Sequence, residues 1–235
     1  MSGHSKWSTI KRKKGAADAK RGAIFTRLSK DITLAARDLG GNPDMNPSLR
    51  LAIKKAKSSN MPIANIERAI KKGTGDLPGI KYDDIIYECY GPSGVAIILE
   101  CLTDNKKRTV SEIKNILSKS GGNLGESGCV NWMFEKKGTI TILKNDISED
   151  KLFDLEIEDF EVSDEHYILT TTPDNFGSVS NSLEKFNINI EGEVGLVPKN
   201  IVEISNSSSS KVLTLMEQLD DHDDIQKVHS NFEII

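Results

Sequence analysis

The spacing of apolar residues changes once along this chain, at the glycine-rich segment 73–79, and this change limits the folds open to it. Before the segment, apolar side chains recur every three to four residues, which predicts amphipathic helices at 18–39, from Pro47 onward and between Pro62 and Gly73. After the segment the period is two, which predicts strands. We therefore expect an N-terminal helical bundle followed by strand-rich units.

The first strand-rich stretch combines a hairpin with a helix and a turn-rich loop. Residues 85–90 and the more apolar 95–102 lie on either side of a Gly-Pro-Ser-Gly turn, which predicts two strands paired as a hairpin, the second more buried. A helix is expected at 109–120, a glycine-rich loop at 121–128 and a further strand at 129–134.

The acidic segment 137–199 has elements in the order β-α-β-β-α-β, with its first helix expected at 149–155; this order is typical of a ferredoxin-like unit. The tail 200–235 reads as strand, helix and strand, which would complete the sheet begun at residue 85. The predicted class is α+β and multidomain: a three-helix bundle followed by two ferredoxin-like α+β units, one inserted in the other. The expected domains are 1–79, 80–136 together with 200–235, and 137–199.

Charge also divides the chain into two parts, a basic N-terminal part and an acidic remainder. Residues 1–75 hold 17 lysines and arginines against 5 acidic residues, a net charge of +12. The whole chain carries −4, so the remainder carries −16. A basic end on an acidic chain indicates a polyanionic partner such as nucleic acid, because clustered cations release counterions from phosphates. The alternative is a solvated basic face on an ordinary helical domain.

The candidate nucleic-acid contacts lie in the basic arm 1–17 and on the polar sides of the first two helices. On the first helix, Lys20, Arg27, Lys30 and Arg37 fall opposite the apolar side at about 100° per residue. The indole of Trp7 would stack on a base or ribose, or else pack back onto the helices. The predicted binding residues are Lys6, Trp7, Lys11, Arg12, Lys13, Lys14, Lys20, Arg21, Arg27, Lys54, Lys55 and Lys57.

Sequence motifs of catalysis are missing from the chain. It has neither a Walker phosphate loop nor a G-x-S-x-G nucleophile elbow, and its four histidines are scattered. Three widely spaced cysteines read as reduced thiols. We therefore expect a non-enzyme without metal or cofactor, without a transmembrane segment or a secretory signal, and with no small-molecule substrate.

Two segments leave a choice between binding and structure. The glycine loop 121–128, with the basic run 106–108 nearby, would approach a phosphate closely or would serve only as a flexible connection. The acidic run 220–224 would attract a cation, or would form a solvated turn between a helix and a strand.

Nine sequence blocks form a recognisable series along the chain: GHSKW at 3–7, DAKRG at 18–22, IFT at 24–26, NMP at 60–62, IERAIK at 66–71, YECYGP at 87–92, ECLTDN at 100–105, GGNLG at 121–125 and DDIQKV at 223–228. In this order and nearly end to end, they closely resemble the YebC family, most weakly across the acidic segment. The departures are small: Cys89, Cys129 and His229 stand where the family usually has glycine, serine and tyrosine.

The resemblance implies three domains and a cytoplasmic, non-enzymatic regulator of gene expression. Family members are assigned as DNA-binding transcriptional regulators, which is the function we expect here. Relatives, including the mitochondrial translational activator of cytochrome c oxidase, act on the ribosome, so the alternative is a translation factor that binds ribosomal RNA and relieves stalling at proline runs. A second alternative is a protein-interaction module that acts through the acidic inserted domain. The basic helices are rich in lysine and poor in amides, which suits phosphate contact more than base readout.

Overall fold

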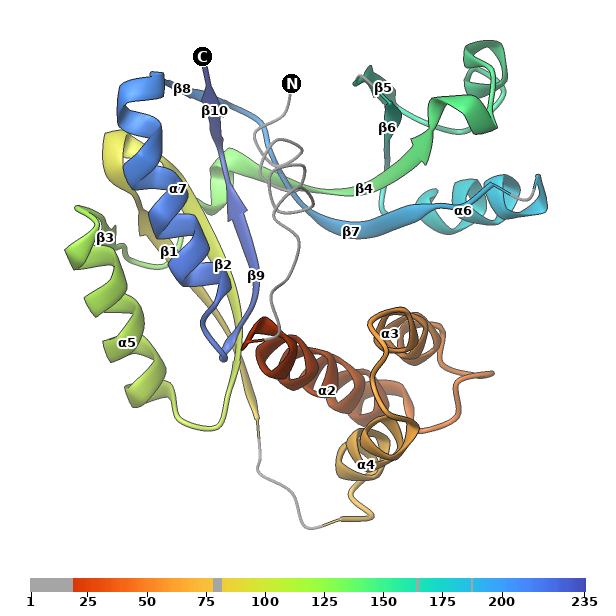
Figure 1. Cartoon of the computed structure of the whole chain (residues 1–235), viewed down its shortest axis with the longest axis horizontal. Helices are drawn as coiled ribbons and strands as arrows, with labels where there is room; N and C mark the ends of the chain where they lie inside the picture. Colours follow the sequence, from red (N-terminus) through yellow and green to blue (C-terminus); the bar gives the residue numbers. More distant parts are fainter. Residues whose placement is uncertain (1–18, 78–81, 164, 187) are drawn as a thin grey trace.

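The N-terminal helices form a three-helix bundle in the computed structural model, which describes residues 19–77, 82–163, 165–186 and 188–235 (Figure 1). Its helices are α2 (Ala19–Leu39), α3 (Pro47–Ser58) and α4 (Ile63–Thr74), close to the predicted bounds. Ile32, Leu49 and Ile66 lie in the core between the three helices.

Polar and glycine positions determine how closely these helices meet. The Asn46 side chain caps α3 by accepting from the Leu49 N–H at 2.9 Å, and it donates to the carbonyls of Ala35 and Gly40. A Cβ at Gly73 would come within 2.7 Å of the Ala36 Cβ and would collide with the Thr33 carbonyl, so α4 can approach α2 only with glycine there.

The first sheet has the strand order β3-β1-β2-β9. It contains β1 (Asp83–Tyr90), β2 (Ala96–Thr103), the short β3 (Asn123–Leu124) and β9 (Ile225–Ser230), so the C-terminal strand does complete the sheet begun by the hairpin. Helices α5 (Lys106–Lys119) and α7 (Asn206–Asp220) cover one face (Figure 1), and the core lies between them and the sheet. Strands β8 (Val202–Ile204) and β10 (Phe232–Ile234) pair in parallel beside it.

The second sheet has the strand order β5-β6-β4-β7, which is the ferredoxin-like order, and all its pairings are antiparallel. Its strands are β4 (Phe134–Leu143), β5 (Asp159–Val162), β6 (His166–Thr171) and β7 (Glu191–Pro198). Helix α6 (Phe176–Lys185) covers it. The helix expected at 149–155 is only the 3-10 turn η4 (Glu149–Leu152), which buries Leu152.

The strand expected at 129–134 is also wrong. Residues 131–133 form the 3-10 turn η2 (Asn131–Met133), and extended structure begins only at Phe134. The reason is Glu88, which is 7% exposed and whose carboxylate accepts the N–H groups of Gly128, Val130 and Asn131 at 2.6, 2.7 and 2.8 Å. Backbone donors captured by a side chain are not available to a strand partner.

The two sheets share a small core. Phe134 of β4 packs with Ala96 and Ile98 of β2, and Leu196 of β7 lies against the same group. The other half of β4, with Ile140 and Ile142, belongs to the core of the second sheet. The α+β class with a leading helical bundle is thus confirmed, whereas the exact domain boundaries stay a prediction. None of the described helices is long and apolar enough to cross a membrane.

Candidate nucleic-acid interface

Helix α3 presents a row of cations to solvent. Arg50, Lys54 and Lys57 are spaced by four and three residues, which places them on one side of the helix, with Lys55 beside them; all four are exposed. Lys54 lies 3.5 Å from Glu184 of α6, and both side chains are more than half exposed. A pair of this kind contributes at most about 1 kcal/mol, so Lys54 can exchange this partner for another anion.

Helix α4 adds a second row that the sequence prediction missed. Arg68, Lys71 and Lys72 are spaced by three and four residues and are exposed. Within the described ranges no ion pair involves any of them. The signal was present in the sequence, because the apolar positions Ile66 and Ala69 already fixed which side of α4 faces the core. We call the seven cations of these two rows the α3–α4 surface: Arg50, Lys54, Lys55, Lys57, Arg68, Lys71 and Lys72.

Helix α2 uses its cations differently. The expectation that Lys30 lies on an outer face is wrong: Lys30 is 6% exposed, because α2 packs against the loop between α7 and β9 as well as against the bundle. Arg27, a predicted binding residue, is half-buried and faces Asp220 at 3.4 Å. Arg37 is exposed but binds Asp84 of β1 at 2.8 Å. These cations attach the bundle to the rest of the chain.

The centre of this attachment is Asp224, which is buried. One carboxylate oxygen accepts from Lys30 Nζ at 2.8 Å; the other accepts from Arg108 at 2.8 Å and from the hydroxyls of Thr109 and Thr103 at 2.8 and 3.1 Å. Burial raises the pKa of Asp224, but the hydrogen bonds from Lys30, Arg108 and Thr109 outweigh it and hold the pKa well below the ordinary value.

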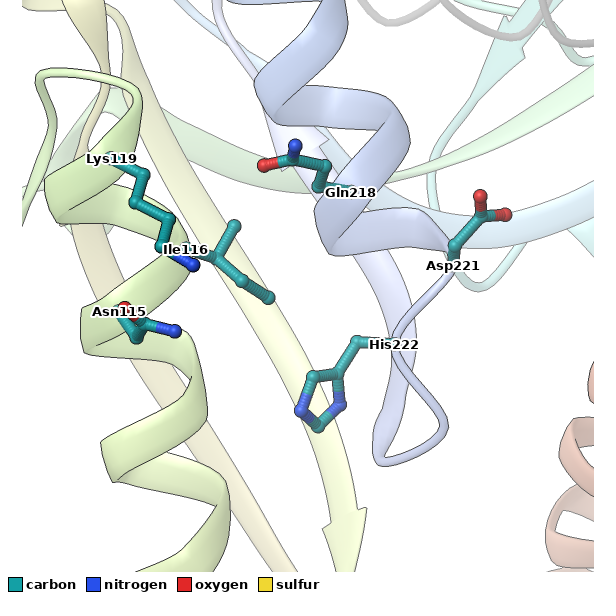
Figure 2. A pocket seen from close by; sticks show the side chains of 6 residues that line it. All are labelled: Asn115, Ile116, Lys119, Gln218, Asp221 and His222. Carbon is teal, nitrogen blue, oxygen red and sulfur yellow. The ribbon is translucent and has the colours of Figure 1, made fainter.

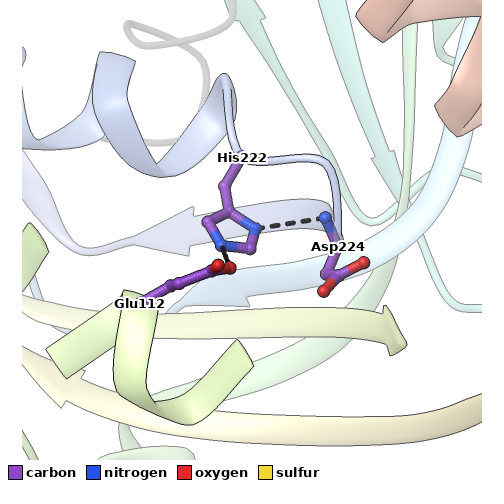
Figure 3. Close-up of side chains that lie close together, drawn as sticks. All are labelled: Glu112, His222 and Asp224. Atoms are coloured by element: carbon purple, nitrogen blue, oxygen red, sulfur yellow. Dashed lines mark hydrogen bonds and ion pairs between the residues drawn. The ribbon is translucent and has the colours of Figure 1, made fainter. Parts of the chain in front are cut away.

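A group of side chains with metal-binding chemistry lies beside this centre. Figure 3 shows the His222 ring between Glu112, whose Oε2 is 2.9 Å from Nε2, and the backbone N–H of Asp224, which donates to Nδ1 at 3.1 Å. Both oxygens of Asp224 are already engaged by two cations and two hydroxyls, and those cations would repel a metal ion. These residues therefore fit an ionic attachment better than a metal centre.

The cavity between α5 and α7 is modest in size and mixed in chemistry. It measures about 380 Å³ and is lined by Asn115, Ile116 and Lys119 from one side and by Gln218, Asp221 and His222 from the other (Figure 2). This lining offers His222 as a base but no hydroxyl or thiol that could act as a nucleophile. The cavity therefore supplies no catalytic constellation.

The glycine amides of the loop 121–128 are already engaged within the chain. The N–H groups of Gly122, Gly125 and Gly128 donate to the Leu117 carbonyl, the Glu88 carbonyl and the Glu88 carboxylate. Glycine is needed here for steric and backbone reasons. A Cβ at Gly122 would lie 2.6 Å from the Tyr90 carbonyl oxygen, and Gly128 has a φ of +88°. The loop is thus a fixed connection.

Eight of the predicted contacts cannot be placed. Lys6, Trp7, Lys11, Arg12, Lys13 and Lys14 lie outside the described residues, and the same holds for the side chains of Lys20 and Arg21. Of the remaining four, Lys54, Lys55 and Lys57 share the α3–α4 surface, and Arg27 does not.

Comparison with known proteins covers nearly the whole chain. Residues 5–76 match the family described as the TACO1/YebC protein N-terminal domain, and residues 82–232 match the TACO1/YebC second and third domain. Proteins named probable transcriptional regulatory protein from Desulfotalea psychrophila and Geobacter sulfurreducens are 53% and 51% identical, over 100% of this chain and 96% of theirs. The crystal structure of a conserved hypothetical protein from Aquifex aeolicus is 42% identical, with a TM-score of 0.84 over 93% of this chain and 92% of that one. The chain therefore belongs to the YebC family.

Proposed function

We propose that this protein is a DNA-binding transcriptional regulator that contacts phosphates through the α3–α4 surface and the basic arm. The observation that carries the proposal is the contrast between two sets of cations. On α2, Arg27, Lys30 and Arg37 are neutralised by acids of the same chain, at Asp220, Asp224 and Asp84. Those of the α3–α4 surface point to solvent, and only Lys54 has an ion pair among the described residues.

Such a surface suits backbone contact rather than base readout. The exposed charged side chains of α3 and α4 are seven lysines and arginines and one acid, Glu67, and the side-chain amide on these helices, Asn65, is half-buried. Adenine readout needs an outward Asn or Gln, and a recognition helix needs base-reading residues near its N-terminus. Binding should therefore be salt-dependent and nearly independent of sequence, unless residues of the arm add specificity.

The relatives support a regulatory role, since those compared are named probable transcriptional regulatory proteins. The alternative remains a translation factor that uses the same surface on ribosomal RNA. The lysine-rich composition of the surface favours this alternative, because phosphate contact without base readout works equally well on a folded RNA.

The test removes three cations from the α3–α4 surface and three from elsewhere. The first variant carries Arg68→Ala, Lys71→Ala and Lys72→Ala; the matched control carries Lys107→Ala, Lys114→Ala and Lys119→Ala, which are exposed on α5. Both lower the net charge by the same amount. Each protein is titrated against labelled duplex DNA and against ribosomes at salt concentrations from about 50 to about 200 mM.

We expect the first variant to lose affinity and to flatten the plot of log affinity against log salt by about 2 to 3 units of slope, since each lost phosphate contact removes about 0.9. The control should keep the wild-type slope. If both variants lose affinity equally, net charge alone explains binding, and the assignment of the α3–α4 surface is refuted. Tight ribosome binding with only weak, salt-sensitive DNA binding would select the translation alternative.

A further inference from the structure

Two phenylalanines stand out on the acidic second sheet because they are exposed in spite of their size. Phe153, which follows η4, is 72% exposed, and Phe186, at the end of α6, is 60% exposed. The Lys151 ammonium lies 5.7 Å from the centroid of the Phe186 ring, so the two elements meet there. We call Lys151, Phe153 and Phe186 the aromatic tip.

The Phe153 ring of the tip is held in place by aromatic rings of the second sheet. The Phe153 ring meets Phe160 edge to face, with centroids 5.8 Å apart at 83°, and Phe160 meets Tyr167 in the same way at 6.0 Å and 84°. Tyr167 is buried in the core of the second sheet. An exposed ring fixed by a row of inner rings is preorganised, because little side-chain freedom remains to be lost on binding.

Acidic side chains surround the tip. The segment 149–159 contains six acids against one lysine, and all six are exposed. Glu158 pairs with Lys137 at 2.7 Å, whereas within the described ranges no ion pair involves Glu149, Asp150, Asp154, Glu156 or Asp159. Beside Phe186 the exposed Glu184 and Lys185 cancel, so residues 149–159 and 184–186 together carry a net charge of −5. This net negative charge disfavours nucleic acid, anionic lipid and a second acidic tip as occupants.

We propose that the aromatic tip docks a basic, amphipathic segment of another protein, with the phenylalanines as apolar anchors and the surrounding acids as partners for lysine or arginine. Aromatic residues are enriched in the cores of protein interfaces, and complementary charge around them favours encounter with the matching partner. The Lys54 to Glu184 pair brings the α3–α4 surface next to the end of α6 that carries Phe186. Resting in this respect on the proposed function, the partner is a basic protein that is itself bound to the same nucleic acid.

The experiment uses two synthetic peptides of equal length and charge. One places leucines at helical spacing (i, i+3, i+4, i+7) among lysines so that it forms an amphipathic helix, and the other has serine in place of each leucine. Their binding to the full-length protein is measured by fluorescence anisotropy. The test variant carries Phe153→Ala and Phe186→Ala; the matched control carries Met45→Ala and Ile63→Ala, which remove two exposed apolar side chains from the bundle.

We expect the wild-type protein and the control to bind the leucine peptide at least about tenfold more tightly than the serine peptide, and the test variant to bind both equally, since one good anchor is worth tenfold or more. A preference that survives in the test variant overturns the proposal. Equal binding of both peptides by the wild type also overturns it, because charge alone would then explain the interaction. The proposal is also overturned if sedimentation shows a dimer of the wild type that the test variant does not form, because the tip would then bind a second copy of this chain.

Failure of this inference is distinguishable from failure of the proposed function. The Phe153→Ala and Phe186→Ala variant should bind DNA as the wild type does. The Arg68, Lys71 and Lys72 variant should in turn keep its preference for the leucine peptide. Because both phenylalanines are exposed, the test variant should also retain its circular dichroism spectrum and melting temperature.

Discussion

Replacing Lys30 by methionine should weaken the attachment of the helical bundle to the rest of the molecule. Methionine keeps the length and apolar stem of lysine and removes only the ammonium group. That group donates to the Asp224 carboxylate at 2.8 Å and to the carbonyls of Asp223 and Leu102 at 2.7 and 3.1 Å. These contacts are largely shielded from water, since Lys30 is only 6% exposed.

The expected loss is about 3 kcal/mol in the free energy of unfolding. Breaking a buried ion pair by removing one partner costs about 3 to 5 kcal/mol, because the other charge is left uncompensated. Here Asp224 keeps Arg108 and two threonine hydroxyls, which places the cost at the lower end. The control Lys71→Met removes an exposed lysine and should change stability by no more than about 0.5 kcal/mol.

Urea unfolding followed by helical circular dichroism measures the difference, together with the proteolysis rate of the linker 75–81. In a cycle with Asp224→Asn, the double variant should lose clearly less than the sum of the single losses, because each single change already breaks the same pair. A Lys30→Met protein as stable as the Lys71→Met control would refute the reasoning.

The pH dependence of this pair follows from the lowered pKa of Asp224. A carboxyl group whose folded-state pKa is depressed stabilises the protein fully above its ordinary pKa of 3.8, and that contribution is lost as the pH falls toward the folded-state value. The stability difference between wild type and Lys30→Met should therefore stay constant between about pH 8 and pH 5 and shrink below about pH 4. If the stability difference already shrinks at pH 6, its pH dependence belongs to a titrating group other than Asp224.

Three further predictions concern the framework. Glu88→Gln leaves the N–H groups of Gly128, Val130 and Asn131 without a charged acceptor and should cost about 2 to 3 kcal/mol in urea unfolding; an unchanged midpoint would contradict the anchoring role. Gly73→Ala should lower the free energy of unfolding by about 1 to 3 kcal/mol because its Cβ meets α2. Gly177→Ala, in a helix with open space around it, should raise it by about 0.5 to 1 kcal/mol. If urea unfolding shows changes of the same sign for both variants, the packing argument is refuted. Burial raises the pKa of Cys101 to about 12, so its thiol should resist iodoacetamide at pH 8 until the protein unfolds, and prompt labelling would disprove its burial.

The helices of the bundle could be predicted from the sequence almost to the residue because local signals mark their ends. Asn46 with Pro47 marks the start of α3, and the apolar spacing of α2 stops at Leu39, before Gly40. The hairpin and the order of strands in the acidic segment followed equally from alternation and turns.

What the sequence could not show depends on contacts distant along the chain. Lys30 reads as a surface lysine because its partner Asp224 lies 194 residues away. The stretch around Val130 reads as a strand because its apolar pattern is right, but Glu88, 42 residues earlier, takes its backbone donors. The cations of α4 were visible in the sequence, yet only the structure shows that Arg27, Lys30 and Arg37 of α2 pair with acids whereas the cations of α3 and α4 stay exposed.

Strand β4 has a mechanical consequence. One of its ends, at Phe134, is part of the core shared with the first sheet, and its other half is part of the core of the second sheet. Ten residues of strand form a beam about 33 Å long, reinforced along most of its length by β7. Because β4 is a paired strand and not a flexible linker, a force applied at Phe153 would be transmitted to the first sheet. Strand β4 would thus keep the aromatic tip, the proposed docking site, at a fixed distance from the first sheet.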